Sequence, residues 1–243
     1  MVGGLDKQIY LPFMLAEKLG YDKDAGLDVA LSDEPAGVNA ETAMLSGQVD
    51  AVGGFYDHNI DPQAKGQSTE SVVSMLQVPG EVGLCRTDLK GVVSPPADFR
   101  GRNLGVTDLG SSADFLTQYL VQENGVPPDQ TRRIGVQAGP TFITALDHQS
   151  IECGRTTEPA ASNLAVPAHR MGSPPTREVV QKLVGAYVRT LKCIQTHSAA
   201  DITAQMPPDY YAGIGKDAYV KAFDSEKGIY NPTGLMPPDG PPT

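Results

Sequence analysis

Small polar residues stand between a short apolar run and a helical pattern in GVTDLGSSADFLTQYL, residues 105–120. Serine at this place has two possible roles. The side-chain oxygen of Ser111 or Ser112, next to the small Gly110, can cap the helix by accepting a hydrogen bond from a free backbone N–H group. Alternatively, the free N–H groups and the helix dipole can hold an anionic ligand there. This stretch alone leaves both roles open.

Three other segments open from a strand or loop into small or polar residues in the same way: residues 3–10, 53–58 and 156–158. Ligands of open α/β sheets bind beyond the carboxyl ends of the strands. Two of the four segments lie early in the chain and two lie later. Two lobes that face each other would bring all four together, which favours a ligand site over simple capping.

Helical and extended patterns alternate along the chain, and this alternation predicts an α/β protein with mainly parallel sheets. The longest pattern, residues 176–197, carries one broad apolar face and predicts a long helix. We expect the other helices at 10–21, 39–47, 112–124 and 140–149, and strands at 27–31, 49–54, 71–77, 81–85, 103–107, 132–136 and 151–154.

Composition excludes several function classes. The 243 residues suffice for one large domain or two small lobes. The formal net charge of −10 argues against nucleic acid and against an anionic membrane surface as partners. The sequence contains no run of 18 apolar residues, so it predicts no membrane-spanning helix. The N-terminus lacks the pattern of a signal peptide, so we expect either a protein that stays inside the cell or a mature or shortened form of an exported one.

Cysteine and histidine spacings predict neither a metal site nor a cofactor. The three cysteines, Cys85, Cys153 and Cys193, form no CxxC pair, and an odd count leaves at least one free thiol. Buried small apolar residues are the default interpretation of such cysteines. The histidines show no metal-binding spacing; they are His58, His148, His169 and His197.

Four blocks of sequence, taken in order, resemble a known family. They are YLPFMLAEKLGYDKDAGLDV, AMLSGQVDAVGGFYDHNI, DFRGRNLGVTDLGSSADFLTQYLVQENGVPPDQ and GPTFITALDHQSIECGRTTEPAAS. They are similar to blocks of the solute-binding proteins that serve ABC importers of sulfonates, nitrate and taurine, a group that includes the thiamine-pyrimidine-precursor proteins. The resemblance covers roughly residues 8–165, and the helix from 176 and YYAGIGKDAYVKAF fit the C-terminal part.

The resemblance implies a type II periplasmic-binding-protein fold, in which two α/β lobes close on a ligand. The ligand would be a small organic solute (sulfonate, taurine-like, nitrate-like or aminopyrimidine), delivered by a periplasmic monomer to an ABC permease without a catalytic step. Among the ligand contacts that the resemblance implies, the Glu158 carboxylate would suit a ligand with an amine or amide donor. Carried to matching positions, the ligand contacts would be Gln8, Tyr10, Gly54, Tyr56, His58, Thr107, Gly110, Ser111, Ser112, Thr157 and Glu158.

The same resemblance divides the chain into residues 1–88 with 176–243 as one lobe and residues 89–165 as the other. The return crossing between them, 166–175, is shorter than the family pattern and contains several prolines. We therefore expect a truncated or internally shortened copy.

Two other functions use the same fold. An enzyme would need a reactive thiol beside a base, and His58 with Cys85 is the pair that the sequence offers. Cys85 lies in a strand pattern, however, where a structural role is more common. A sensor that presents its ligand to a receptor would have the same binding site.

Overall fold

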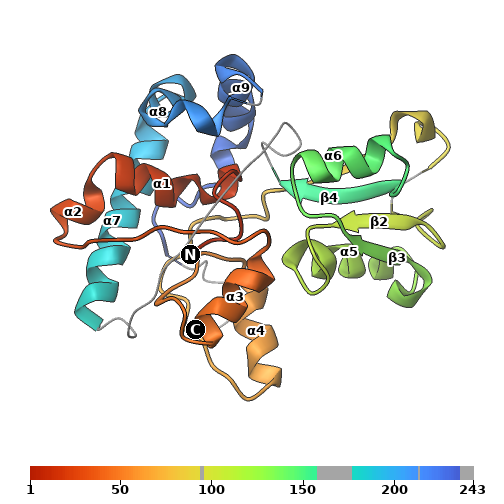
Figure 1. Cartoon of the computed structure of the whole chain (residues 1–243), viewed down its shortest axis with the longest axis horizontal. Helices are drawn as coiled ribbons and strands as arrows, with labels where there is room; N and C mark the ends of the chain where they lie inside the picture. The colour runs from red at the N-terminus through yellow and green to blue at the C-terminus, as the bar shows by residue number, and fades with distance from the viewer. Residues whose placement is uncertain (94–95, 158–176, 213, 236–243) are drawn as a thin grey trace.

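The computed structural model describes residues 1–93, 96–157, 177–212 and 214–235. Figure 1 shows a four-stranded sheet with two helices at one end of the molecule and the remaining helices at the other. We call residues 81–93 and 96–157 the sheet part, and residues 1–80, 177–212 and 214–235 the helical part. Chain segments far apart in sequence make up the helical part, so the chain passes from it into the sheet part and returns.

The sheet has the strand order β1-β4-β2-β3. Its strands are β1 (Glu81–Cys85), β2 (Asn103–Val106), β3 (Arg132–Gly135) and β4 (Cys153–Thr157). β2 runs parallel to β3 and β4, as expected, but β1 pairs antiparallel with β4. The sheet is therefore mixed, with mainly parallel pairing as predicted and one antiparallel strand at its edge. Residues 81–88, which the sequence interpretation placed in the first lobe, include β1.

Two helices cover opposite faces of this sheet because side chains alternate along a strand. Leu104 of β2 packs with Val121 of α5 (Ser112–Glu123). Gly105 and Gly154 face the other way, where added side-chain carbons would meet Phe142 of α6 (Pro140–Asp147). Glycine at these two positions lets Phe142 approach the backbone, so α6 lies close on that face.

The helical part holds a separate apolar core. Leu11, Met14 and Leu15 of α1 (Leu11–Lys18) pack against Leu191 and Ile194 of α7 (Arg177–Thr196). The buried side chains at Ile202, Met206, Tyr219, Phe223 and Tyr230 complete this core. The other helices are α2 (Tyr21–Asp24), α3 (Gly37–Leu45), α4 (Asp57–Ala64), α8 (Ala199–Gln205) and α9 (Lys216–Glu226), with short 3-10 turns at Gln8–Tyr10, Thr87–Leu89, Pro128–Gln130, Pro208–Tyr210 and Lys227–Ile229.

Three expected strands, 27–31, 49–54 and 71–77, are wrong as strands. Residues 27–31 keep the expected alternation of half-buried and exposed side chains, but no ladder forms along them. Pairing in this region is confined to isolated bridges, such as those of Val2 with Asp33 and Gly53. A period-two pattern predicts which face is buried, whereas a strand also requires a neighbour over several residues.

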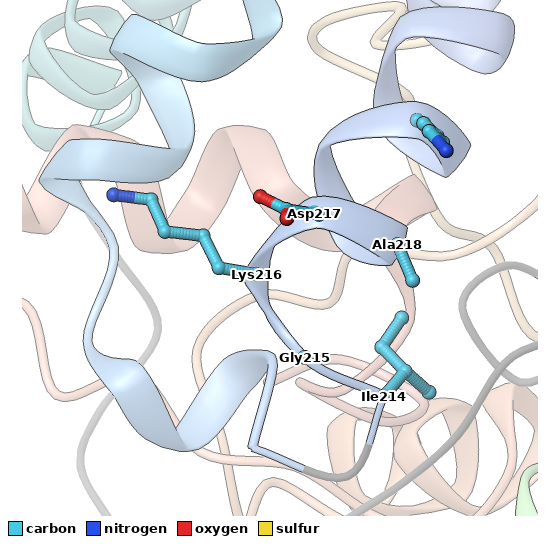
Figure 2. Close-up of a pocket in the computed structure, with 6 residues that line it drawn as sticks. Ile214, Gly215, Lys216, Asp217 and Ala218 are labelled. Atoms are coloured by element: carbon cyan, nitrogen blue, oxygen red, sulfur yellow. The ribbon is translucent and has the colours of Figure 1, made fainter.

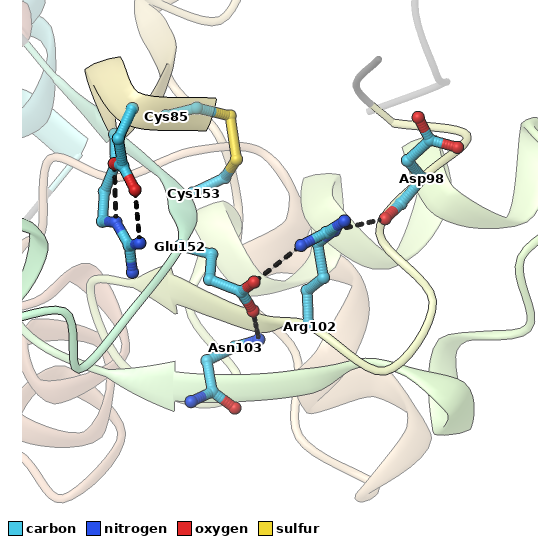
Figure 3. The surroundings of a disulfide bond; sticks show 8 residues. Cys85, Asp98, Arg102, Asn103, Glu152 and Cys153 are labelled. Atoms are coloured by element: carbon cyan, nitrogen blue, oxygen red, sulfur yellow. Dashed lines mark hydrogen bonds and ion pairs between the residues drawn. A yellow bond between two sulfur atoms is a disulfide. The ribbon is translucent and has the colours of Figure 1, made fainter. Parts of the chain in front are cut away.

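A disulfide joins Cys85 of β1 to Cys153 of β4, which are directly opposite in the register of the two strands. Figure 3 shows it beside an ion pair of Arg102 with Glu152, whose carboxylate also accepts from the backbone N–H of Asn103. The default interpretation of these two cysteines as reduced apolar residues is therefore wrong. Cys193 is a free thiol, as the odd count requires.

The predicted division into two lobes remains a prediction, and the return crossing at 166–175 lies outside the described residues. Across the described part of the chain, we find no helix with the length and apolar character needed to span a membrane.

Candidate functional site

A small cavity lies between the helical part and the sheet part. Its volume is about 20 Å³, which is room for about one water molecule. The helical part lines it with Lys7, Ile9, Tyr10, Gly37 and Phe55, and the sheet part with Glu81, Thr107, Ser111, Ser112, Ala113 and Thr157. The sheet-part residues come from β1, the end of β4, the segment after β2 and the first turn of α5. The cavity therefore lies beyond the carboxyl ends of the parallel strands, where ligands of open α/β sheets bind.

Ser111 caps α5 with its side chain. Its Oγ accepts hydrogen bonds from the Asp114 N–H (3.3 Å) and from the Thr107 hydroxyl (2.8 Å). The backbone N–H groups of Ser112 and Ala113 donate no hydrogen bond within the described part of the chain. Both residues line the cavity, so two N–H groups at the positive end of the helix dipole remain available beside it.

Ser112 bridges the two parts of the molecule. Its hydroxyl lies 2.9 Å from each carboxylate oxygen of Asp57, at the first residue of α4. His58 Nε2 is 3.4 Å from the same hydroxyl, and His58 Nδ1 is 2.8 Å from the buried carboxylate of Glu41. The Ser112 proton is thus held by a carboxylate, and the His58 ring is fixed from behind by Glu41.

Two charged side chains of opposite sign line the cavity without pairing with each other. Lys7 is 4% exposed and donates to the backbone carbonyls of Gly3 and Pro35; burial lowers the pKa of its ammonium group. Burial raises the pKa of the Glu81 carboxyl to about 7, although the positive charges of Arg155 and Lys7 partly offset this effect. The cavity wall therefore carries a carboxyl group that titrates near neutral pH.

Buried polar atoms without partners gather on one side of this cavity. Glu81 Oε2 and Thr157 Oγ1 are both buried, and neither has a hydrogen-bond partner within the described chain. Thr157 is only 2% exposed. Because buried polar groups are nearly always hydrogen-bonded, these two oxygens mark a place where a bound molecule would supply the missing partners.

The structure brings together five of the residues expected at the site. Tyr10, Thr107, Ser111, Ser112 and Thr157 line the cavity. Tyr10 is 5% exposed, and burial raises the pKa of its hydroxyl.

The remaining expected residues lie elsewhere. His58 lies behind the wall, bonded to Glu41. The amide of buried Gln8 donates to the Tyr219 carbonyl in the core of the helical part (3.3 Å). Gly110 forms a left-handed turn at φ +79° and donates its N–H to Asp114. Gly54 and Tyr56 precede α4 and do not line the cavity, and Glu158 lies outside the described residues.

Sequence reasoning missed the two charged residues of the cavity, Lys7 and Glu81. Lys7 lies in the loop of residues 3–10, in which only Gln8 and Tyr10 were expected to contact a ligand. A 3-10 turn over Gln8–Tyr10 buries Gln8 and keeps Lys7 at the cavity. The available signal for Glu81 was a carboxylate opening an apolar strand just after Pro79 and Gly80. Ile9, Gly37, Phe55 and Ala113 were also missed.

A second hollow lies at the start of α9. Figure 2 shows it, with Ile214, Gly215, Lys216, Asp217 and Ala218 around it. All its lining residues come from one short stretch that ends at Lys221, and none follows a strand of the sheet. It is an open surface depression, so we place the functional site at the cavity between the two parts.

Neither a metal centre nor a thiol pair is supported by the described residues. Within the described ranges, no three His, Cys, Asp or Glu side chains are grouped to hold a metal ion. The suggested pairing of His58 with a Cys85 thiol is wrong, because Cys85 is bonded to Cys153.

Comparison with known proteins identifies the family. The sequence model described as "NMT1/THI5 like" matches residues 8–155, which is more than half of the chain. The chain belongs to this family. One relative is the 4-amino-5-hydroxymethyl-2-methylpyrimidine phosphate synthase of Candida albicans (strain WO-1), 27% identical over 146 residues. That match covers 60% of this chain but only 41% of the relative, so the chain spans about two fifths of the relative's length.

Solved structures of similar proteins give the fold. A protein from Bordetella bronchiseptica RB50 superposes with a TM-score of 0.86 at 28% identity, covering 98% of this chain and 84% of that one. The alkanesulfonate-binding protein SsuA of Xanthomonas axonopodis pv. citri, solved with bound MOPS, gives a TM-score of 0.71 at 14% identity, covering 97% and 84%. This NMT1/THI5-like chain therefore has the generic periplasmic-binding-protein fold, an α/β structure with a mixed sheet.

Proposed function

We propose that this chain binds one small organic solute in the cavity between its two parts and delivers it to the permease of an ABC importer. The observation that carries the proposal is the composition of the cavity wall, which both parts of the molecule contribute. Free helix N–H groups, a buried lysine and unpartnered oxygens line this one cavity, as expected of a specific site for a small polar molecule.

Binding requires the two parts to separate and close again. The cavity of about 20 Å³ is too small for any organic solute, and the bond between Ser112 and Asp57 holds its two walls together. A solute that contacts both walls only when they are closed would shift the population towards the closed state.

The candidate solutes are sulfonates, taurine-like molecules, nitrate-like anions and aminopyrimidines. The SsuA neighbour, by its description an alkanesulfonate-binding protein with bound MOPS, supports the first class. The Candida relative, named as a pyrimidine phosphate synthase, supports the last. We propose binding without a catalytic step.

We further propose that the chain acts as a monomer in the periplasm. The disulfide of Cys85 with Cys153 supports this location, because disulfides persist in oxidising compartments. It also removes the thiolate that the enzyme alternative needs.

Thermal unfolding of the purified chain with a panel of alkanesulfonates, taurine, nitrate and aminopyrimidines tests the proposal. A solute present at 100 times its Kd should add about 2.7 kcal/mol to the free energy of unfolding. We expect one class to raise the midpoint, and Phe55→Ala in the cavity wall to reduce the effect. Phe115→Ala, on the outer surface of α5, is the matched control. A panel without any shift, or the same shift in Phe55→Ala as in the wild type, would contradict the proposal.

A further inference from the structure

Glu81 stands at the point where the chain passes from the helical part into the sheet part. It opens β1, and Gly80 before it packs closely against the helical part. A side-chain carbon added at Gly80 would lie 2.5 Å from Ile9 and 2.8 Å from Ile229. The Glu81 side chain lines the cavity between the two parts, and its Oε2 is buried with no hydrogen-bond partner among the described residues. The charge of this carboxyl group therefore affects the contact between the parts.

Both parts of the molecule place charged or titratable groups around this carboxyl. Arg155 of β4 acts on it from the sheet part, and Lys7, Tyr10 and Asp57 act on it from the helical part. Lys7 gives its hydrogen bonds to backbone carbonyls. Among the described residues, neither cation forms an ion pair with Glu81. The carboxylate form would therefore be buried without a direct partner when the parts are closed.

Loss of hydration is the main reason why the charged form of this carboxyl is unfavourable. Burial raises the pKa of Glu81 to about 7, and this effect outweighs the opposite effect of the two cations. The helical wall of the cavity contributes to the burial, because it covers the wall of the sheet part. When the parts separate, water enters the cavity and the carboxylate regains its hydration. The closed chain thus holds the proton more tightly than the open chain.

We infer that the proton on Glu81 controls the opening of the cavity in the absence of solute. With the proton bound, the two parts stay closed, and its loss to water shifts the population to the open state that admits a solute. This inference rests on the proposed function, in which the parts close on a solute, and adds its regulation by pH. The state that binds the proton more tightly is favoured at low pH, so the chain is closed in mild acid and open in mild base.

The size of the effect follows from the pKa of the carboxyl in the two states. It is about 7 in the closed state and returns to the ordinary value of 4.5 in a fully hydrated open state. The ratio of closed to open chain then falls about 30-fold between pH 5.5 and pH 8.5. A change of this size turns a roughly fivefold excess of closed chain into a roughly fivefold excess of open chain.

Small-angle X-ray scattering of the solute-free chain tests this control. We expect the wild type to have a larger radius of gyration at pH 8.5 than at pH 5.5, with unchanged far-UV circular dichroism to show that the chain stays folded. Glu81→Gln should keep the compact value at both pH values, because it cannot ionise. Arg155→Gln should move the rise to higher pH, because the lost positive charge no longer favours the carboxylate. Glu123→Gln, exposed in the last turn of α5, is the matched control.

His58 also lies at the contact between the parts, and its own titration has to be separated from that of Glu81. Its Nδ1 is 3.9 Å from the Asp57 carboxylate that bonds Ser112. His58→Gln should retain the pH-dependent opening. An equal radius of gyration at both pH values in the wild type would overturn the inference, and so would a rise that persists in Glu81→Gln. These samples contain no solute, so either result leaves the proposed function to be judged by its own solute panel.

Discussion

The buried carboxyl of Glu81 should make the stability of the free protein depend on pH in a specific direction. Burial raises its pKa in the folded state from the ordinary value of 4.5 to about 7, so between these pH values the folded chain binds more protons than the unfolded chain. Stability is then highest below pH 4.5 and falls as the pH rises towards 7. The charged groups that act on this carboxyl are Arg155 of β4, Lys7 and Asp57 of α4.

The magnitude follows from the same two pKa values. Each pKa unit corresponds to about 1.4 kcal/mol, so raising the pH from 5 to 8.5 should cost about 2.5 kcal/mol at this one residue. Glu81→Gln removes the titration while keeping the shape of the side chain. The variant should therefore lack this part of the pH dependence and be more stable than the wild type at pH 8.5.

Urea unfolding of both proteins at pH 5 and pH 8.5 measures the difference, because all other titrating groups cancel in the comparison. Glu123→Gln, an exposed residue in the last turn of α5, is the matched control and should follow the wild type. An identical pH dependence in wild type and Glu81→Gln would refute the reasoning, since it would mean that this carboxyl is not desolvated.

Two further predictions concern the sheet that carries the site. The disulfide closes a loop with a sequence separation of 68, so replacing both Cys85 and Cys153 by alanine should lower the free energy of unfolding by about 4 kcal/mol. Cys193→Ala is the control in denaturant titrations, and a loss below about 1 kcal/mol would count against the bond. Gly154→Ala should cost about 2 kcal/mol by overpacking, since its new carbon would lie 2.4 Å from the Gly105 carbonyl oxygen. Gly83→Ala on β1 meets no atom within 4 Å, and equal unfolding midpoints for the two variants would contradict this packing.

Local signals were sufficient to predict many of the elements. The serine cap and apolar spacing of residues 112–124 gave a helix that the structure has at Ser112–Glu123, and the broad apolar face of 176–197 gave the helix at Arg177–Thr196. Both depend on residues within a few positions of one another, because helix hydrogen bonds and caps are local. Residues 27–31 show the opposite case. Their alternating pattern is a local property, whereas a strand also needs a partner strand from a distant part of the chain.

Most of the correctly predicted site residues follow strand ends; Tyr10, in the N-terminal loop, does not. Thr107, Ser111 and Thr157 follow from the rule that ligands bind beyond the carboxyl ends of strands. Glu81 could not be found in this way, because its burial depends on the antiparallel pairing of β1 with β4, far along the chain. Likewise, nothing near Ser112 in sequence indicates that its hydroxyl meets Asp57, 55 positions away.

The central claim is that the solute occupies the cavity between the two parts, which must separate to admit it. The most direct measurement is a binding titration of a chain carrying both Asp57→Cys and Ser112→Cys, using the solute of the panel that binds the wild type most tightly. The account predicts no binding while the new cysteines are cross-linked and a return of binding after reduction, with the wild type in the same reductant as the control. Undiminished binding in the cross-linked chain would contradict the account.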